Sequence, residues 1–255
     1  MTGTQTPSAQ VPVRVFGGPT ALIEYGGLRF LTDPTFDAPR AYDSGLTKTA
    51  PSAASPADLG RIDVVLLSHD EHDDNLDASG RALLADVPLT LTTPGGAARL
   101  GGNARGLADW EAVELDRPDG GTITVTGVPA LHGPGDRAEL EPIVGQVVGF
   151  VLTGDGLPTV YVSGDNAQLG LVKEIAGRFG PVDTAVLFAG AVRTAILDHA
   201  LLTLDSAQAA EAAQILGARQ IVPVHFDSWA HFTEGRDELV NAFGAAGLLD
   251  RVDLA

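Results

Sequence analysis

The chain has 255 residues, of which 44% are hydrophobic, so it is long enough to bury one large core. Its formal net charge is −17, which repels nucleic-acid phosphates and anionic membrane surfaces. It has no cysteine, so disulfides and thiolate chemistry are excluded, and a metal would need histidine, carboxylate or backbone oxygen as ligands. We therefore expect a small-molecule substrate and no nucleic-acid partner.

The N-terminal residues 1–11 are predicted to form a disordered tail before a single domain at 12–255. The opening MTGTQTPSAQ lacks the basic end and apolar block of a signal peptide. No run of 18 apolar residues occurs, so no membrane insertion is expected. We predict a cytoplasmic protein, and we leave a homo-oligomer open as an alternative to a monomer.

Apolar alternation and glycine turns predict strands along most of the chain. They lie at 12–17, 20–25, 28–32, 62–67, 88–93, 121–128, 147–153, 158–163, 183–188 and 220–225. Helices are predicted from Asp77 to about Asp86, Asn166 to about Phe179, Asp205 to about Leu216 and Glu234 to about Phe243. Residues 34–60, rich in Pro, Ala and Ser, predict a long irregular segment that lines a site.

Two parts of the chain resemble each other. Residues 21–36 and 150–166 each give a strand, a glycine turn, a second strand and an acid, Asp33 in one and Asp165 in the other. A further strand follows in each part, introduced by a glycine and an aspartate. Two such sheets packed face to face predict an α/β fold, a four-layer αββα sandwich with two similar halves.

The segment LLSHDEHDDNLD, residues 66–77, follows an apolar strand and is strongly acidic. Its acids Asp70, Glu71, Asp73 and Asp74 repel one another at pH 7, so the loop is either solvated or completed by a cation. Histidine beside carboxylate suits Zn²⁺, Mn²⁺ or Fe²⁺ better than Ca²⁺ or Mg²⁺.

Other side chains of the same kind also follow predicted strands. His132, Asp165 and His225 each come at or just after a strand end, where a rigid scaffold delivers ligands to a shared rim. His199, Arg193 and His231 lie in no such motif, and we predict that they contact substrate. His199 ranks ahead of His231 because it comes shortly after the strand at 183–188. The alternatives are structural or exposed histidines and an ordinary surface ion pair for Arg193.

In this order of motifs the chain resembles the metallo-β-lactamase superfamily. Within it, the resemblance is to the group that includes L-ascorbate-6-phosphate lactonases and N-acyl-phosphatidylethanolamine-type phospholipases D. It covers roughly residues 12 to 250 and is carried by five landmarks: Asp33 in FLTDP, the loop at 69–75, His132, Asp165 in VSGDN and His225 in VPVHFDSW.

The loop departs from the family pattern H-x-H-x-D-H. Counted from its start, Glu71 takes the second histidine position. Counted back from NLD, His72 is the second histidine, Asp74 the acid, and Asn75 replaces the last histidine. We favour the second register because it keeps more ligand types. It leaves Glu71 and Asp73 as flanking acids or unorthodox ligands.

The resemblance implies one or two ions, Zn²⁺ in the first place. His69, His72 and His132 would hold the first ion. Asp74, His225 and Asn75 would hold a weaker second ion, with Asp165 between the two. Asp33 would orient a ligand histidine rather than bind an ion itself.

The implied activity is metal-dependent hydrolysis by a metal-bound hydroxide, since a bound ion lowers the pKa of water from 15.7 towards about 7. Asp74 or Asp165 would hold the proton and pass it to the leaving group. We expect a lactone or ester substrate, with a phosphoester or amide as alternatives. The competing hypothesis is a catalytically decayed metal-binding or ligand-sensing protein, because the loop has lost a histidine in either register.

Overall fold

The computed structural model describes residues 10–254, so most of the expected N-terminal tail, residues 1–9, lies outside the described residues. Gln10 is exposed, but Val11 is buried and packs with core residues, so the described core begins one residue before the expected boundary. Within residues 10–254, no helix has the length and apolar character needed to cross a membrane.

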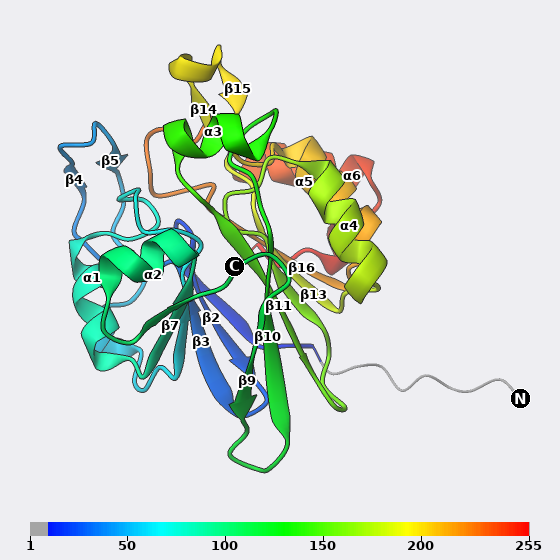
Figure 1. Cartoon of the computed structure of the whole chain (residues 1–255). Coiled ribbons are helices and arrows are strands. Elements are labelled where there is room, and N and C mark those ends of the chain that lie inside the picture. The colour runs from blue at the N-terminus through cyan, green and yellow to red at the C-terminus, as the bar shows by residue number, and fades with distance from the viewer. Residues whose placement is uncertain (1–9, 255) are drawn as a thin grey trace, which may run out of the picture.

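Two six-stranded sheets pack face to face (Figure 1). The first sheet has the order β1 (Val13–Gly17), β2 (Thr20–Tyr25), β3 (Leu28–Thr32), β6 (Val64–Leu66), β7 (Leu89–Thr92) and β8 (Ala104–Gly106). The second has the order β16 (Gln220–Val224), β13 (Thr184–Phe188), β12 (Val160–Val162), β11 (Val148–Gly154), β10 (Thr122–Pro129) and β9 (Ala112–Asp116). In each sheet an antiparallel meander continues into parallel strands.

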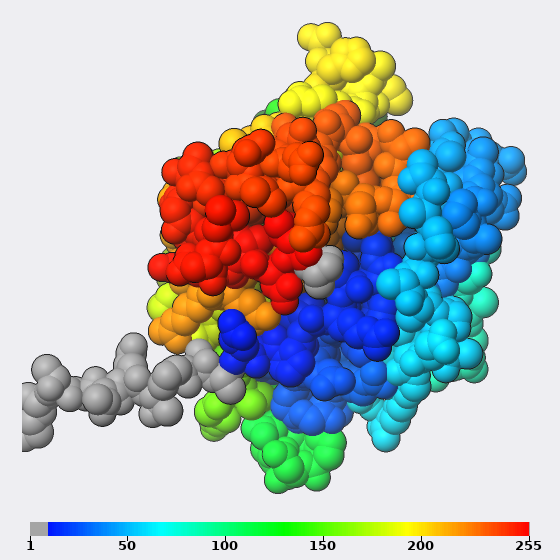
Figure 2. Space-filling model, turned by 180° about the vertical axis from the view of Figure 1, so that it is seen from behind, coloured from blue at the N-terminus to red at the C-terminus, as the bar shows by residue number. Residues whose placement is uncertain are grey.

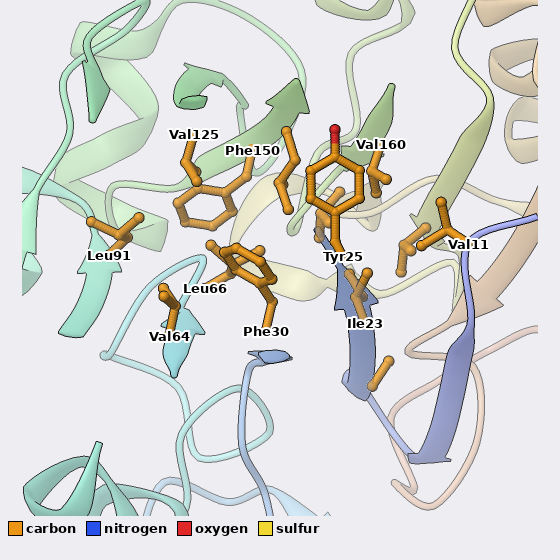
Figure 3. Packing of buried hydrophobic residues seen from close by; sticks show 14 of the residues in the cluster. Val11, Ile23, Tyr25, Phe30, Val64, Leu66, Leu91, Val125, Phe150 and Val160 are labelled. Atoms are coloured by element: carbon orange, nitrogen blue, oxygen red, sulfur yellow. The ribbon is translucent and has the colours of Figure 1, made fainter. Parts of the chain in front are cut away.

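The main core lies between the sheets and follows from the two-residue period of the strands. Phe30 and Leu66 face the opposite sheet, where they meet Phe150 and Val125, and all four side chains are buried (Figure 3). Leu31, the residue after Phe30 on β3, points the other way and joins a second cluster on the outer face of the first sheet. The strands are therefore apolar on both faces, which explains their nearly continuous hydrophobic runs.

Helices cover both outer faces, so the predicted αββα sandwich is confirmed (Figure 1). On the first sheet lie α1 (Ala78–Leu83) and α2 (Pro94–Leu100), and on the second α4 (Leu169–Phe179), α5 (Ser206–Leu216) and α6 (Arg236–Ala245). The remaining helical elements are α3 (Arg137–Val144) and the short turns η1 (Pro56–Asp58), η2 (Leu84–Asp86), η3 (Ala195–Leu197) and η4 (Leu249–Arg251).

Two small hairpins stand away from the sheets at the end where the helices α3 and α2 lie (Figure 1). They are formed by β4 (Arg40–Ala41) with β5 (Thr47–Lys48), and by β14 (Arg193–Thr194) with β15 (Ala200–Leu201). The first belongs to the long irregular segment predicted at 34–60. The second, together with α3, β8 and β9, was not predicted, because these short elements carry little periodicity.

The helix starts show that a predicted N-cap residue located one helix correctly and another one only approximately. Asp205 caps α5 as predicted, its carboxylate accepting from the Gln208 amide at 2.8 Å. Helix α4 begins at Leu169 rather than after Asn166. The Asn166 side chain instead accepts from the Leu131 and Gln168 amides, so it braces two chain segments before the helix starts.

Candidate metal centre

The ligand-type side chains that the sequence placed at strand ends do converge in the fold. His69 and His72 come from the loop after β6 in the first sheet. His132 follows β10 and Asp165 follows β12, both in the second sheet. One nitrogen or oxygen from each of these four residues lies within 4.8 Å of the others. His69, His132 and Asp165 are buried, and His72 is partly exposed.

The hydrogen bonds of His132 fix which of its nitrogens faces the cluster. Nδ1 is 2.8 Å from the Leu202 carbonyl oxygen, so Nδ1 must carry the proton and donate. Nε2 is then a bare acceptor that faces Asp165 Oδ2 at 3.8 Å. A lone pair directed at a carboxylate is repulsive unless a cation lies between them, so this pair fits a metal site.

His69 is held in a similar way through Ser68. Asp33 Oδ1 accepts from both the amide and the hydroxyl of Ser68, at 2.7 and 2.9 Å. The Ser68 oxygen therefore accepts from His69 Nδ1, 3.0 Å away, and His69 Nε2 is left without a proton. Nε2 faces His72 Nδ1 at 2.8 Å. Asp33 thus acts on the His69 ring indirectly, through Ser68, rather than by contact.

A second group of side chains adjoins the first. Asp74 Oδ2 lies 3.1 Å from His225 Nε2 and 2.9 Å from His231 Nε2. His225 Nε2 is also 3.6 Å from Asp165 Oδ1, so the two groups share Asp165. Asn75 is buried, and its amide nitrogen lies 3.5 Å from Asp165 Oδ1.

Burial favours the neutral form of three imidazoles of the site, those of His69, His132 and His225. Burial, reinforced by the neighbouring rings, holds the pKa of His69 well below its ordinary value. Burial and the His72 ring lower the pKa of His132 to about 3. Burial also lowers the pKa of His225, against the pull of Asp74. Neutral imidazole is the form that binds a metal ion.

Within residues 10–254, the ion pairs of Asp74 and Asp165 are formed with histidines and not with lysine or arginine. Burial and then the charges of Asp74 and Asp33 raise the pKa of Asp165 well above its ordinary value. Burial would also raise the pKa of Asp74, but hydrogen bonds from His225 and His231 outweigh it and hold that pKa well below normal. The two adjacent carboxylates therefore do not both carry a charge easily, and a divalent cation would relieve this repulsion.

Gly164 allows the two sheets to meet beside the site. Its φ is +57°, and a Cβ there would lie 2.9 Å from Ser68 Cβ and 2.8 Å from the Val148 carbonyl oxygen. The Val148 amide in turn donates to the Ser68 carbonyl at 3.1 Å. The SGD sequence is therefore a close crossing point that brings Asp165 next to the His69 loop.

The flanking acids of the loop point elsewhere. Glu71 and Asp70 both pair with Arg99, at 3.0 and 2.6 Å. Asp73 accepts from the Ser44 hydroxyl at 2.6 Å. The fold thus groups His72 rather than Glu71 with the other ligand-type residues, which is the arrangement of the favoured register.

A pocket of about 310 Å³ opens onto the cluster. Its polar lining consists of Ser44, His72, Asp74, His132, Asp165, Arg193, Thr194 and His231. Its apolar lining consists of Leu46, Ile143, Val144, Val192, Ile196 and Leu202. The apolar residues come mainly from α3 and from the β14–β15 hairpin with the segments beside it.

The structure places His231 at the pocket and His199 outside it, the reverse of the expected order. His199 is exposed on the β14–β15 hairpin and is not among the pocket-lining residues, and its carbonyl oxygen accepts from Arg193 at 3.0 Å. His231 lines the pocket and contacts Asp74. The hairpin places His199 away from the end of β13, although the two are close in sequence. The number of residues between them does not reveal this path of the chain.

Two residues that position the site were missed. Ser68 links Asp33 to His69, and Asn166 braces the loop that carries His132. Both are direct neighbours in sequence of a predicted ligand, His69 or Asp165, and Asn166 was expected only as a helix start.

A family model described as the β-lactamase superfamily domain matches residues 28–226, well over half of the chain. The chain belongs to the metallo-β-lactamase superfamily. The expected family is therefore confirmed. A curated superfamily relative, a metal-dependent hydrolase from Anaeromyxobacter sp. (strain K), is 29% identical over 84% of this chain and 73% of its own.

Solved structures show the same superfamily fold. An isothiocyanate hydrolase from Delia radicum gut bacteria has a TM-score of 0.77 at 24% identity, covering 94% of both chains. A possible metal-dependent hydrolase from Veillonella parvula has a TM-score of 0.80 at 17% identity, covering 97% of both chains. The expected enzyme class is confirmed at this level: the chain is a metal-dependent hydrolase of this superfamily.

Proposed function

We propose that this protein is a zinc-dependent hydrolase of small lactones or esters that carry an apolar group. The observation that supports this most directly is the convergence of His69, His72, His132 and Asp165 within 4.8 Å at the base of a pocket. Three imidazoles with one carboxylate form a donor set that suits Zn²⁺, although Mn²⁺ and Fe²⁺ also bind such sites.

A cation held there would supply Lewis acidity, lowering the pKa of water and polarising the substrate's electrophilic oxygen. The chain's own residues supply the proton steps. Asp74 and Asp165 both line the pocket, so either carboxylate can take a proton from an attacking water and return it to the leaving alkoxide. Arg193, exposed at the rim, can meet a carboxylate or phosphate on the substrate.

The apolar wall supports a substrate with a hydrophobic substituent. Ile143 and Ile196 line the pocket, yet they are 51% and 76% exposed. When an apolar ligand covers such exposed apolar side chains, their surface is removed from water, and this favours binding. Each methylene buried on binding contributes about 0.8 kcal/mol, so kcat/KM should rise roughly fourfold per added CH₂ along a p-nitrophenyl ester series.

The substrate prediction is tested with Ile196→Ser, which changes the pocket wall at an exposed position. We expect normal thermal stability and a flatter dependence of kcat/KM on acyl-chain length. Ile143→Ser should act in the same direction. A dependence as steep as that of the wild type in both variants would contradict an apolar subsite at this wall.

The proposed activity is tested by metal analysis together with hydrolysis assays of a lactone, a p-nitrophenyl ester and bis(p-nitrophenyl) phosphate. We expect bound zinc and turnover of the lactone or the ester, with both lost in His132→Ala. His199→Ala, which removes an exposed histidine outside the pocket, is the matched control and should keep both. Stoichiometric metal without turnover of any substrate would indicate a metal-binding or sensing protein instead.

An isothiocyanate is a second candidate substrate, favoured by the same apolar pocket. Its electrophilic carbon is neutral and carries an apolar substituent, so it needs no anion-binding group. The fold is shared with the solved isothiocyanate hydrolase over 94% of both chains. Benzyl isothiocyanate therefore belongs in the same assay panel, and turnover of it in preference to the ester would replace our first choice of substrate.

A further inference from the structure

We propose that His231 is a ligand of a second divalent cation, which it shares with Asp74, His225 and Asp165. This inference rests on the proposed function but assigns a residue that no family motif of the chain includes. The ligand atoms are already assembled: Asp74 Oδ2 is 2.9 Å from His231 Nε2 and 3.1 Å from His225 Nε2, and Asp165 Oδ1 is 3.6 Å from His225 Nε2.

Asp165 is oriented to serve both groups of ligands. Its Oδ2 faces His132 Nε2 at 3.8 Å, in the first group, and its Oδ1 faces His225 Nε2, in the second. A carboxylate whose two oxygens face two separate sets of imidazole nitrogens has the geometry of a bridge between two ions. Two ions held by these groups would supply positive charge for both the attacking and the leaving oxygen of a hydrolysis.

His231 takes the place that the sequence had given to Asn75. The Asn75 amide directs Nδ2, a donor, towards Asp165 Oδ1 and towards Ser68 Oγ, each at 3.5 Å. An N–H group cannot coordinate a cation, so in this orientation Asn75 is a hydrogen-bond donor to the bridging carboxylate. An imidazole, unlike an amide, can carry its proton on either ring nitrogen, so His231 can move its proton to Nδ1 and supply through Nε2 the nitrogen ligand that Asn75 does not.

The backbone around His231 is held on both sides, as a ligand position requires. Before it, the Ala230 amide donates to the Thr47 carbonyl at 3.0 Å, and after it the Thr233 amide donates to the Gly190 carbonyl at 3.0 Å. Figure 2 shows the orange surface of this segment pressed against the light-blue β4–β5 region. The His231 ring also packs on Phe232, with centroids 4.5 Å apart, and its side chain is 20% exposed.

The second ion should be the weaker of the two. In the first group His69 Nδ1 and His132 Nδ1 each have a hydrogen-bond partner, whereas Nδ1 of His225 and of His231 is buried without one among the described residues. Such outer partners orient the ring and raise its basicity, and their loss typically costs 10- to 100-fold in affinity. A mild chelator should therefore empty the second site first.

The test is a Zn²⁺ titration of the metal-free full-length chain, followed by calorimetry and by elemental analysis after gel filtration. We expect two ions in the wild type, and one ion in His231→Ala and His231→Gln. The dissociation constant of the second ion should rise more than about 100-fold, beyond what loss of an outer partner costs. His199→Ala is the matched control and should still bind two ions. Circular dichroism establishes that each variant is folded, and the conservative His231→Gln replaces His231→Ala if the latter is not.

The outcomes separate this inference from the proposed function. Two ions in the folded His231 variants, or a smaller rise in the dissociation constant, would overturn the ligand assignment and leave the hydrolase intact. A wild type that binds one ion would likewise overturn it. A wild type that binds no ion would remove the proposed zinc hydrolase itself.

Discussion

At the scale of single residues, the site depends on which nitrogen of each histidine keeps its proton. Ser68 donates to Asp33 and accepts from His69 Nδ1, and the Leu202 carbonyl accepts from His132 Nδ1. Both arrangements leave Nε2 bare. Because neighbouring groups set the tautomers of His69 and His132, both rings direct a lone pair towards the cluster, as binding of a metal ion would require.

The two registers of the acidic loop make opposite predictions for neighbouring residues. Glu71→Gln should keep the metal content and change stability by less than about 1 kcal/mol, since its ion pair with Arg99 is partly exposed to solvent. His72→Ala should lose metal from the first group. Metal analysis of the two purified variants decides the matter: an empty Glu71→Gln and a filled His72→Ala would reverse our register.

At the scale of elements, the two halves share one hydrogen-bond pattern, made by an aspartate just before a parallel strand. The Asp63 amide donates to the Arg29 carbonyl and the Asp63 carboxylate accepts from the Arg29 amide. Asp183 makes the same pair of bonds with Thr159. Each aspartate thus fixes the register between a hairpin strand and the parallel strand next to it.

This register corrects one pairing suggested by the sequence. The residue equivalent to Asp33 is Ser163, not Asp165. Asp33 accepts from the Ser68 amide, and Ser163 accepts through its hydroxyl from the Phe188 amide, at the matching position of the other half. Asp165 lies two residues further on, where only the second half has an acid, so the halves share a framework but not a ligand.

Lys48 is the buried charge that ties the irregular segment to the sandwich. It is 2% exposed, and its ammonium donates to the Thr35 carbonyl at 2.8 Å and to Asp77 at 3.3 Å. Removing one partner of a buried pair leaves the other charge uncompensated, so Lys48→Met should lower the free energy of unfolding by about 3 kcal/mol. Urea unfolding measures this loss.

Lys173→Met is the control for that experiment, because Lys173 is the only other lysine and is exposed on α4. It should change the free energy of unfolding by less than about 0.5 kcal/mol. Equal stability of the two variants would show that the Lys48–Asp77 pair contributes little to this fold.

At the scale of the whole molecule, the site joins the two sheets. His69 and His72 extend from the first sheet, and His132 and Asp165 from the second, so an ion bound by all four would cross-link the sandwich. Ligand at 100 times its dissociation constant stabilises a folded protein by about 2.7 kcal/mol. For a chain of this size that corresponds to roughly 5–10 °C in melting temperature.

We therefore expect chelation to lower the melting temperature by that amount and added Zn²⁺ to restore it. His132→Ala should melt at the metal-free temperature whether or not Zn²⁺ is present. Differential scanning calorimetry gives all of these values. A melting temperature of the wild type that does not respond to chelator or to Zn²⁺ would argue against a cross-linking ion.

The sequence by itself determined most of the long strands, the layered fold and the fact that His69, His132, Asp165 and His225 follow strand ends. Those features are local, because the two-residue period and the punctuating glycines act over a few residues. Only the tertiary structure decided that His72 rather than Glu71 lies beside His69, His132 and Asp165, and that His231 rather than His199 reaches Asp74. These choices depend on Arg99 and on the path of the β14–β15 hairpin, contacts between residues distant in the chain that no local pattern records.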